Sequence, residues 1–122
     1  MATAGYLRRM TRRLVEDLEV ADAAEIADES RSHGAQCASE CSRGERVRIF
    51  GELRSVQTCS ANAKAGVVAE FFDGTDTVTL KWLGRNRIPG IEPGRKLWVS
   101  GRVAEHDGTK MIFNPYYELA GD

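Results

Sequence analysis

The chain has 122 residues, 42% of them hydrophobic and 29% charged, and its formal net charge is -1 at pH 7. This length allows one domain with a modest core plus an appendage, and the near-zero charge argues against a protein that coats nucleic acid through charge alone. No apolar run reaches the roughly 20 residues of a membrane span and no secretory signal pattern opens the chain, so we expect a cytoplasmic protein.

The charge is unevenly divided along the chain. Residues 1–44 contain six Arg and eight acids, whereas residues 45–122 contain eleven Lys and Arg and ten acids. Local clusters therefore matter more than the total. The cysteines are an odd number, which argues against the disulfide framework of a secreted domain; they are Cys37, Cys41 and Cys59.

The first predicted element is an amphipathic helix from Tyr6 to about Ala27. Its narrow apolar stripe has three- and four-residue spacing and consists of Leu7, Met10, Leu14, Leu18 and Ala21. Arginines occupy its first half and acids its second, which opposes the helix dipole, so packing or a partner must stabilise it. A polar, Gly- and Ser-containing linker follows over residues 29–44. We predict a helix and linker at 1–43 and a folded domain at 44–119.

Five short runs of alternating apolar and polar residues follow, separated by Gly, Asp and Pro. In the first run Val56 falls out of phase, which predicts a bulge or bend near Gly51. Hairpin turns are expected at residues 73–76 and 106–109, a longer connection at 85–94, and a last strand from Lys110 to Asn114. The residues predicted to point inward are Val47, Ile49, Gly51, Leu53, Val67, Ala69, Phe71, Val78, Leu80, Trp82, Leu97, Val99, Gly101 and Val103.

The predicted fold class is therefore mainly β, a five-stranded barrel preceded by an N-terminal amphipathic α-helix. Five strands with a long connection between the third and the fourth are the layout of an oligonucleotide/oligosaccharide-binding (OB) barrel. Such a barrel has little room for a buried active site and acts through its outer surface and loops.

Three stretches strengthen this interpretation by resemblance. Residues 72–75 and 78–83 resemble the central hairpin of bacterial OB domains of the tRNA-anti type. Residues 93–97, 101–103 and 114–118 resemble the wedge domain of RecG-type branch-migrating DNA helicases, and residues 82–91 are similar to short actinobacterial OB-fold proteins described as nucleic-acid binding. The resemblance covers residues 44–118 and implies an OB fold. The chain has no Gly-x-x-x-x-Gly-Lys-Ser/Thr motif for ATP, so any unwinding activity would belong to a partner.

Nucleic-acid binding by a barrel needs cations that follow phosphates and flat side chains on which bases stack. Strand alternation and the loops predict such a surface at Arg48, Arg54, Lys64, Phe72, Thr79, Lys81 and Lys110. A secondary basic patch flanks the long connection and consists of Arg85, Arg87, Arg95 and Lys96. The alternatives are that Phe50 or Phe72 caps the barrel or packs under the N-terminal segment, and that the patch is an ordinary solvated loop.

Trp98 is also predicted to point outward. An exposed Trp is costly, so we expect the apolar stripe of the helix or the connection at 88–91 to cover it; the alternative is that Trp98 stacks on a base.

The spacing His33-x-x-x-Cys37-x-x-x-Cys41 could contribute zinc ligands, completed by Cys59 or His106. A second close pair is missing from the sequence, so we predict no metal and no cofactor; the alternative to a metal site is that Cys37 and Cys41 are plain or redox-sensitive thiols. His106 beside Asp107 lacks an accompanying nucleophile or acid pair, so no enzyme is predicted.

These features together predict a non-catalytic protein that binds single-stranded or structured DNA or RNA with little base specificity. The alternative is a protein-interaction module whose barrel surface and N-terminal helix contact a partner or a second copy. DNA and RNA remain equal alternatives from the sequence.

Overall fold

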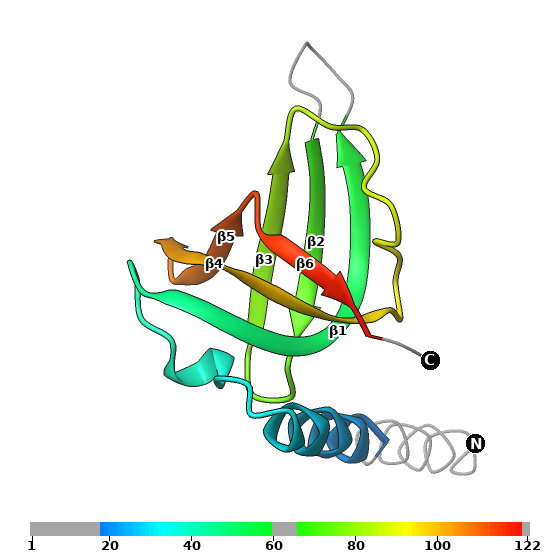
Figure 1. Ribbon diagram of the computed structural model, residues 1–122, viewed down its shortest axis with the longest axis vertical. Coiled ribbons are helices and arrows are strands. Elements are labelled where there is room, and N and C mark those ends of the chain that lie inside the picture. The colour runs from blue at the N-terminus through cyan, green and yellow to red at the C-terminus, as the bar shows by residue number, and fades with distance from the viewer. Residues whose placement is uncertain (1–17, 60–65, 121–122) are drawn as a thin grey trace, which may run out of the picture.

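The computed structural model describes residues 18–59 and 66–120, and these form a mainly β structure that follows one N-terminal helix (Figure 1). The described part of this helix covers residues 18–32, and the 3-10 helix η1 (Ala38–Glu40) follows it. The strands are β1 (Arg46–Cys59), β2 (Gly66–Phe72), β3 (Thr77–Leu83), β4 (Lys96–His106), β5 (Thr109–Phe113) and β6 (Tyr116–Leu119).

The strands pair in an order that returns to its starting point. The second half of β1 pairs with β2 and its first half with β4, both antiparallel. β2 pairs with β3, β3 runs parallel to β5, and β5 pairs with β4. The pairing therefore runs β1-β2-β3-β5-β4 and back to β1, and β6 is added along β4. The long first strand is thus shared between two halves of a barrel-like sheet, and the bend that the sequence predicts in it is consistent with this arrangement.

The bend in β1 combines a bulge with a glycine. The register with β2 shifts between Leu53 and Ser55, three residues beyond the predicted position. Gly51 has a different role, because a Cβ there would lie 2.4 Å from the carbonyl oxygen of Phe72. The absence of a side chain lets β1 cross the end of β2 closely.

The predicted inward residues are confirmed as the core. Ile49, Leu53, Phe71, Leu80 and Leu97 are fully buried, and the other large side chains of the predicted set are at most 5% exposed. Gly101 also faces inward, because a Cβ there would meet the side chain of Ile112. Strand phase was therefore predictable from alternation alone.

The prediction of five strands is wrong by one. The last predicted strand ends at Phe113, because Asn114 has a positive φ of 49° and Pro115 has no amide hydrogen to donate. The chain then resumes as β6. Both β5 and β6 lie along the same edge of β4, opposite residues 103–106 and 97–100 respectively. The last predicted strand therefore corresponds to β5, and β6 is an additional strand that the sequence analysis did not predict.

The helix packs through a different face from the predicted one. It continues to residue 32, and Leu18, a member of the predicted stripe, is 68% exposed. Ile26 and Ser30 are buried instead. A Cβ on Gly74 would lie 2.5 Å from the carbonyl oxygen of Ala23 and 2.7 Å from the Cβ of Ala27. Small residues therefore let the helix backbone approach the turn between β2 and β3. Leu7, Met10 and Leu14 lie outside the described residues.

The segment expected to be a linker contributes to the core. Ala38 is fully buried and Cys41 is 5% exposed, and both belong to the same cluster as the strand residues. The predicted boundary between 43 and 44 therefore leaves two core residues on its N-terminal side.

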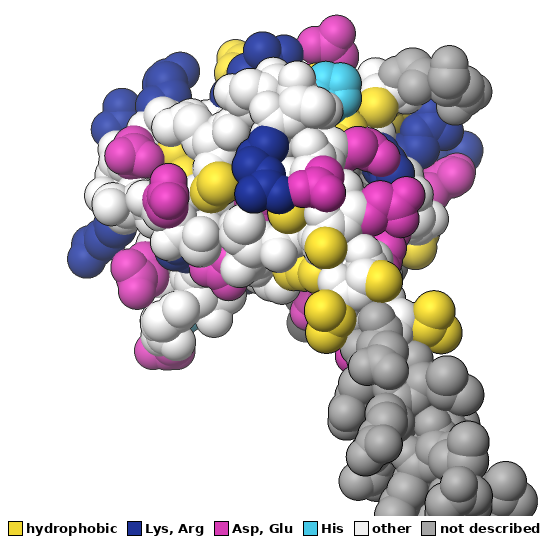
Figure 2. All heavy atoms as spheres, turned by 90° about the horizontal axis from the view of Figure 1, so that it is seen from below, with side chains coloured by type: hydrophobic (Ala, Val, Ile, Leu, Met, Phe, Trp, Pro, Cys, Tyr) yellow, Lys and Arg dark blue, Asp and Glu magenta, His cyan; other side chains and the backbone are white. Residues whose placement is uncertain are grey.

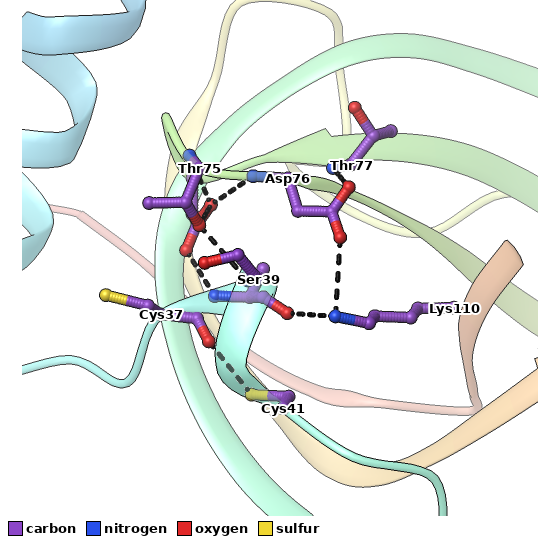
Figure 3. A network of polar contacts seen from close by, with 9 residues as sticks. Cys37, Ser39, Cys41, Thr75, Asp76, Thr77 and Lys110 are labelled. Carbon is purple, nitrogen blue, oxygen red and sulfur yellow. Dashed lines mark hydrogen bonds and ion pairs between the residues drawn. The ribbon is translucent and has the colours of Figure 1, made fainter.

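A buried carboxylate fixes this segment to the β2–β3 turn (Figure 3). Asp73 is 1% exposed, and its Oδ2 accepts a hydrogen bond of 2.7 Å from the amide of Ala38. Its Oδ1 accepts bonds from the amide and hydroxyl of Thr75, at 2.8 and 2.6 Å, and from the amide of Asp76 at 3.0 Å. Four donors therefore compensate the burial of one charge.

We expect Asp73→Asn to lower the free energy of unfolding by about 2–4 kcal/mol. The Asn side chain has one acceptor oxygen in place of two, and its NH2 group would face a buried N–H or O–H donor. Urea denaturation followed by circular dichroism measures the change. Asp107→Asn is the matched control, since Asp107 is exposed in a turn at φ 51°, which Asn tolerates. Equal stability of the two variants would contradict this role for Asp73.

Candidate nucleic-acid interface

The predicted surface is brought together only in part. The Arg54 guanidinium carbon lies 5.0 Å from the centre of the Phe72 ring, as a stacking-and-phosphate surface requires. Arg54 is also ion-paired, however, at 2.5 Å to Asp22 and at 3.3 Å to Glu52. Asp22 lies on the N-terminal helix, whose docking side the sequence did not reveal. Two carboxylates therefore compensate the central cation of this surface.

The remaining predicted residues of this surface have separate surroundings. The Nζ of Lys110 donates to the carbonyl oxygen of Ala38 at 2.6 Å and lies 3.3 Å from the Asp76 carboxylate (Figure 3). It thus ties η1 to the start of β3. Thr79 and Lys81 are half-buried on the outer face of β3, opposite Met111 and Phe113 of β5. Lys64 lies outside the described residues.

The predicted secondary patch contains exposed and paired cations. Arg85, Arg87 and Arg95 are exposed. The Nζ of Lys96 lies 2.6 Å from Glu29 Oε1, and this hydrogen bond raises the pKa of Lys96 above its ordinary value. Figure 2 shows the molecule from below, where basic side chains lie beside acidic ones. The described side chains on that face therefore carry charges of both signs.

A different face combines cations with aromatic rings, namely the outer side of β1, β4 and β6. Arg46 of β1 is opposite Arg102 of β4, and Arg48 is opposite Ser100, which is itself opposite Tyr116 of β6. The inward residues of these strands alternate with this set. We call Arg46, Arg48, Trp98, Arg102 and Tyr116 the arginine strip.

The cations of the arginine strip are lightly compensated. Arg48 lies over the Trp98 ring, 4.0 Å from its centre, and its acidic contact is Glu118 at 3.7 Å. Among the described residues, neither Arg46 nor Arg102 forms an ion pair, and Arg102 donates to the carbonyl oxygen of Gly44 at 3.2 Å. The Tyr116 side chain is 79% exposed. Charge and flat surface are therefore both accessible here.

Trp98 points outward as predicted and is half-buried, but its covering groups differ from the predicted ones. Its ring contacts Phe50 and His33, with centroid distances of 5.4 and 5.6 Å. His33 follows the helix and also packs against Phe50 at 4.5 Å. Phe50 is 1% exposed outside the main core cluster. The alternative in which Phe50 packs under the N-terminal segment is thus the observed one.

The cysteines of the candidate metal motif lie around η1. The Cys41 Sγ donates to the carbonyl oxygen of Cys37 at 3.3 Å, and burial, followed by the nearby Glu45 carboxylate, raises the pKa of Cys41. Within 18–59 and 66–120, His, Cys, Asp and Glu side chains do not gather in groups of three or more. The Cys59 side chain lies outside the described residues.

Comparison with known proteins adds no family. No protein-family model matches the chain, and no curated protein matches it. Among the described residues, no helix is long and apolar enough to cross a membrane.

Proposed function

We propose that this protein is a non-catalytic, cytoplasmic OB-fold protein that binds single-stranded or structured nucleic acid along the arginine strip. The order of strand pairing supports the fold, since an OB barrel is a five-stranded, partly open Greek-key barrel. The interruption at Asn114 and Pro115 then divides the fifth strand of that barrel into β5 and β6.

The observation on which the function rests is the stacking of Arg48 on Trp98 beside Arg46 and Arg102. Single-strand binding combines cations that follow the backbone with rings that stack on bases. These contacts recognise phosphates and ring faces, which every sequence offers, so little base specificity is expected. The strip has three arginines, and we therefore expect modest affinity at physiological salt.

The surface around Arg54 and Phe72 is the weaker candidate for the same function. A phosphate there would have to displace Asp22 or Glu52 from Arg54. Among the residues that the structure describes, Arg46 and Arg102 form no ion pair and Arg48 forms one, with Glu118 at 3.7 Å. Phosphate binding to the arginine strip therefore requires fewer ion pairs to be broken.

Titration of the whole chain against labelled single-stranded DNA and RNA at several salt concentrations tests the proposal. Two or three phosphate contacts predict a slope of log affinity against log salt of about -1.4 to -2.1. Absence of binding to both nucleic acids at low salt would overturn it.

The second candidate function is a protein-interaction module. Leu83 and Phe113 are 58% and 47% exposed, and they extend from the neighbouring ends of β3 and β5. The amide of Leu83 donates to the Asn114 side chain at 2.9 Å, which holds these ends together. Exposed apolar side chains at neighbouring strand ends favour a protein partner, and failure of the salt titration would favour this function.

A further inference from the structure

A groove lies beside the arginine strip, between the end of the helix and the start of β4. Its volume is about 540 Å³, within the 300–1,000 Å³ of typical small-molecule sites. It is lined by an aromatic group, Phe50, His33 and Trp98, and by the charged side chains Glu29, Arg95, Lys96 and Glu118. We call this hollow the Trp98 groove.

One side of the Trp98 groove is aromatic. Phe50, His33 and Trp98 pack edge to face or tilted, and all three line the groove. Arg48 lies over the Trp98 ring but does not line the groove, so the groove reaches Trp98 from another side. Phe50 is 1% exposed, so a flat ligand in the groove would contact the rings of His33 and Trp98, which Phe50 supports from below.

The other sides of the groove carry charges of both signs. Glu29 and Lys96 form an ion pair of 2.6 Å, and Glu118 contributes a largely exposed carboxylate. Arg95 is exposed and has no acidic partner among the residues that the structure describes. The groove thus offers a free cation for a phosphate and carboxylate oxygens for hydrogen-bond donors.

We propose that the Trp98 groove binds one nucleotide, with its base against the aromatic cluster and its phosphate on Arg95. Carboxylates only accept hydrogen bonds, and at ring position 4 cytosine carries an amino donor where uracil carries a carbonyl oxygen. A carboxylate facing that position therefore favours cytosine over uracil. This inference rests on the proposed function and deepens it, because Trp98 belongs both to the groove and to the strip. A strand lying along β4 would place one of its nucleotides in the groove.

Trp fluorescence reports binding directly. The chain has two tryptophans, and Trp82 is 5% exposed in the core, so quenching by added nucleotide reports Trp98. We expect CMP to quench saturably and to bind about tenfold more tightly than UMP, the value of one hydrogen bond to a charged group. In Trp98→Phe, which keeps a ring, the quenching should disappear while CMP binding persists in calorimetry.

A charge-matched pair of variants tests the phosphate position. Arg95→Gln should weaken CMP binding about tenfold and leave cytidine binding unchanged. Arg43→Gln is the control, because Arg43 lies far from the groove. It precedes Gly44, whose amide donates to the carbonyl oxygen of Val103, and Val103 is five residues, or roughly 16 Å, along β4 from Trp98. Absence of saturable quenching, or equal CMP binding by the two variants, would overturn the inference.

The nucleotide site in the groove and the proposed nucleic-acid-binding function can be refuted independently of one another. Oligonucleotide binding without any CMP binding would remove the groove from the site and leave the arginine strip in place. CMP binding without oligonucleotide binding would identify a mononucleotide site and contradict the proposed function.

Discussion

Replacing Trp82 with alanine is expected to lower the free energy of unfolding by about 3–5 kcal/mol, the usual cost of removing a large aromatic side chain from a core. Trp82 is 5% exposed, and its ring packs against that of Tyr117 with a centroid distance of 5.9 Å. Its Nε1 donates to the carbonyl oxygen of Pro115 at 3.1 Å. The substitution therefore creates a cavity and leaves a buried carbonyl without its donor. Urea denaturation followed by far-ultraviolet circular dichroism measures the loss.

Trp82→Phe separates the two contributions, because it keeps most of the ring and removes the hydrogen bond. We expect this variant to lose about 1–3 kcal/mol, the cost of an unpaired buried acceptor. Small domains have about 5–15 kcal/mol of stability, so the alanine variant approaches unfolding. If the alanine variant were as stable as the parent, the inward phase of β3 would be contradicted.

The strand phase was predictable because alternation is a local property. Val78, Leu80 and Trp82 alternate with polar residues in one short run, and no other part of the chain is needed to identify their face. The turn between β4 and β5 was predictable for the same reason. Asp107 and Gly108 both have positive φ values, as a two-residue hairpin turn requires.

The helix packing was not predictable from the spacing of large apolar residues. The helix approaches the turn between β2 and β3 through Ala23 and Ala27, and this close approach depends on Gly74, about fifty residues later in the chain. The same helix brings Asp22 to Arg54 and Glu29 to Lys96. Arg54 and Lys96, both predicted to bind phosphate, are therefore ion-paired to acids of the helix. These pairs depend on how the helix docks, which no single stretch of the sequence specifies.

The candidate interface was predictable only at Arg48. Arg46 and Arg102 face each other across β1 and β4 although more than fifty residues separate them in the chain. The antiparallel register that pairs them is set by the whole ring of strands. Once that register is known, the alternation that identified the core also identifies the strip, because Trp98 and Arg102 alternate with Leu97, Val99 and Gly101.

The largest effect on binding is expected from Arg46→Gln combined with Arg102→Gln. Both arginines are exposed and outside any described ion pair, so their loss should hardly change the melting temperature. Loss of two single-strand phosphate contacts should reduce the salt slope by about 1.4 and the affinity by roughly tenfold or more. The weakening should be similar for every oligonucleotide sequence, because phosphates carry no base identity.

The matched comparison is Arg54→Gln combined with Lys81→Gln, which removes the same charge from the surface predicted by the sequence alone. Asp22 and Glu52 already compensate Arg54, so this pair should change the salt slope much less. A larger loss from Arg54 and Lys81 than from Arg46 and Arg102 would place the interface on the β2–β3 face. In that case the ion pair between Asp22 and Arg54 would have to open when nucleic acid binds, and Asp22→Asn would then increase affinity.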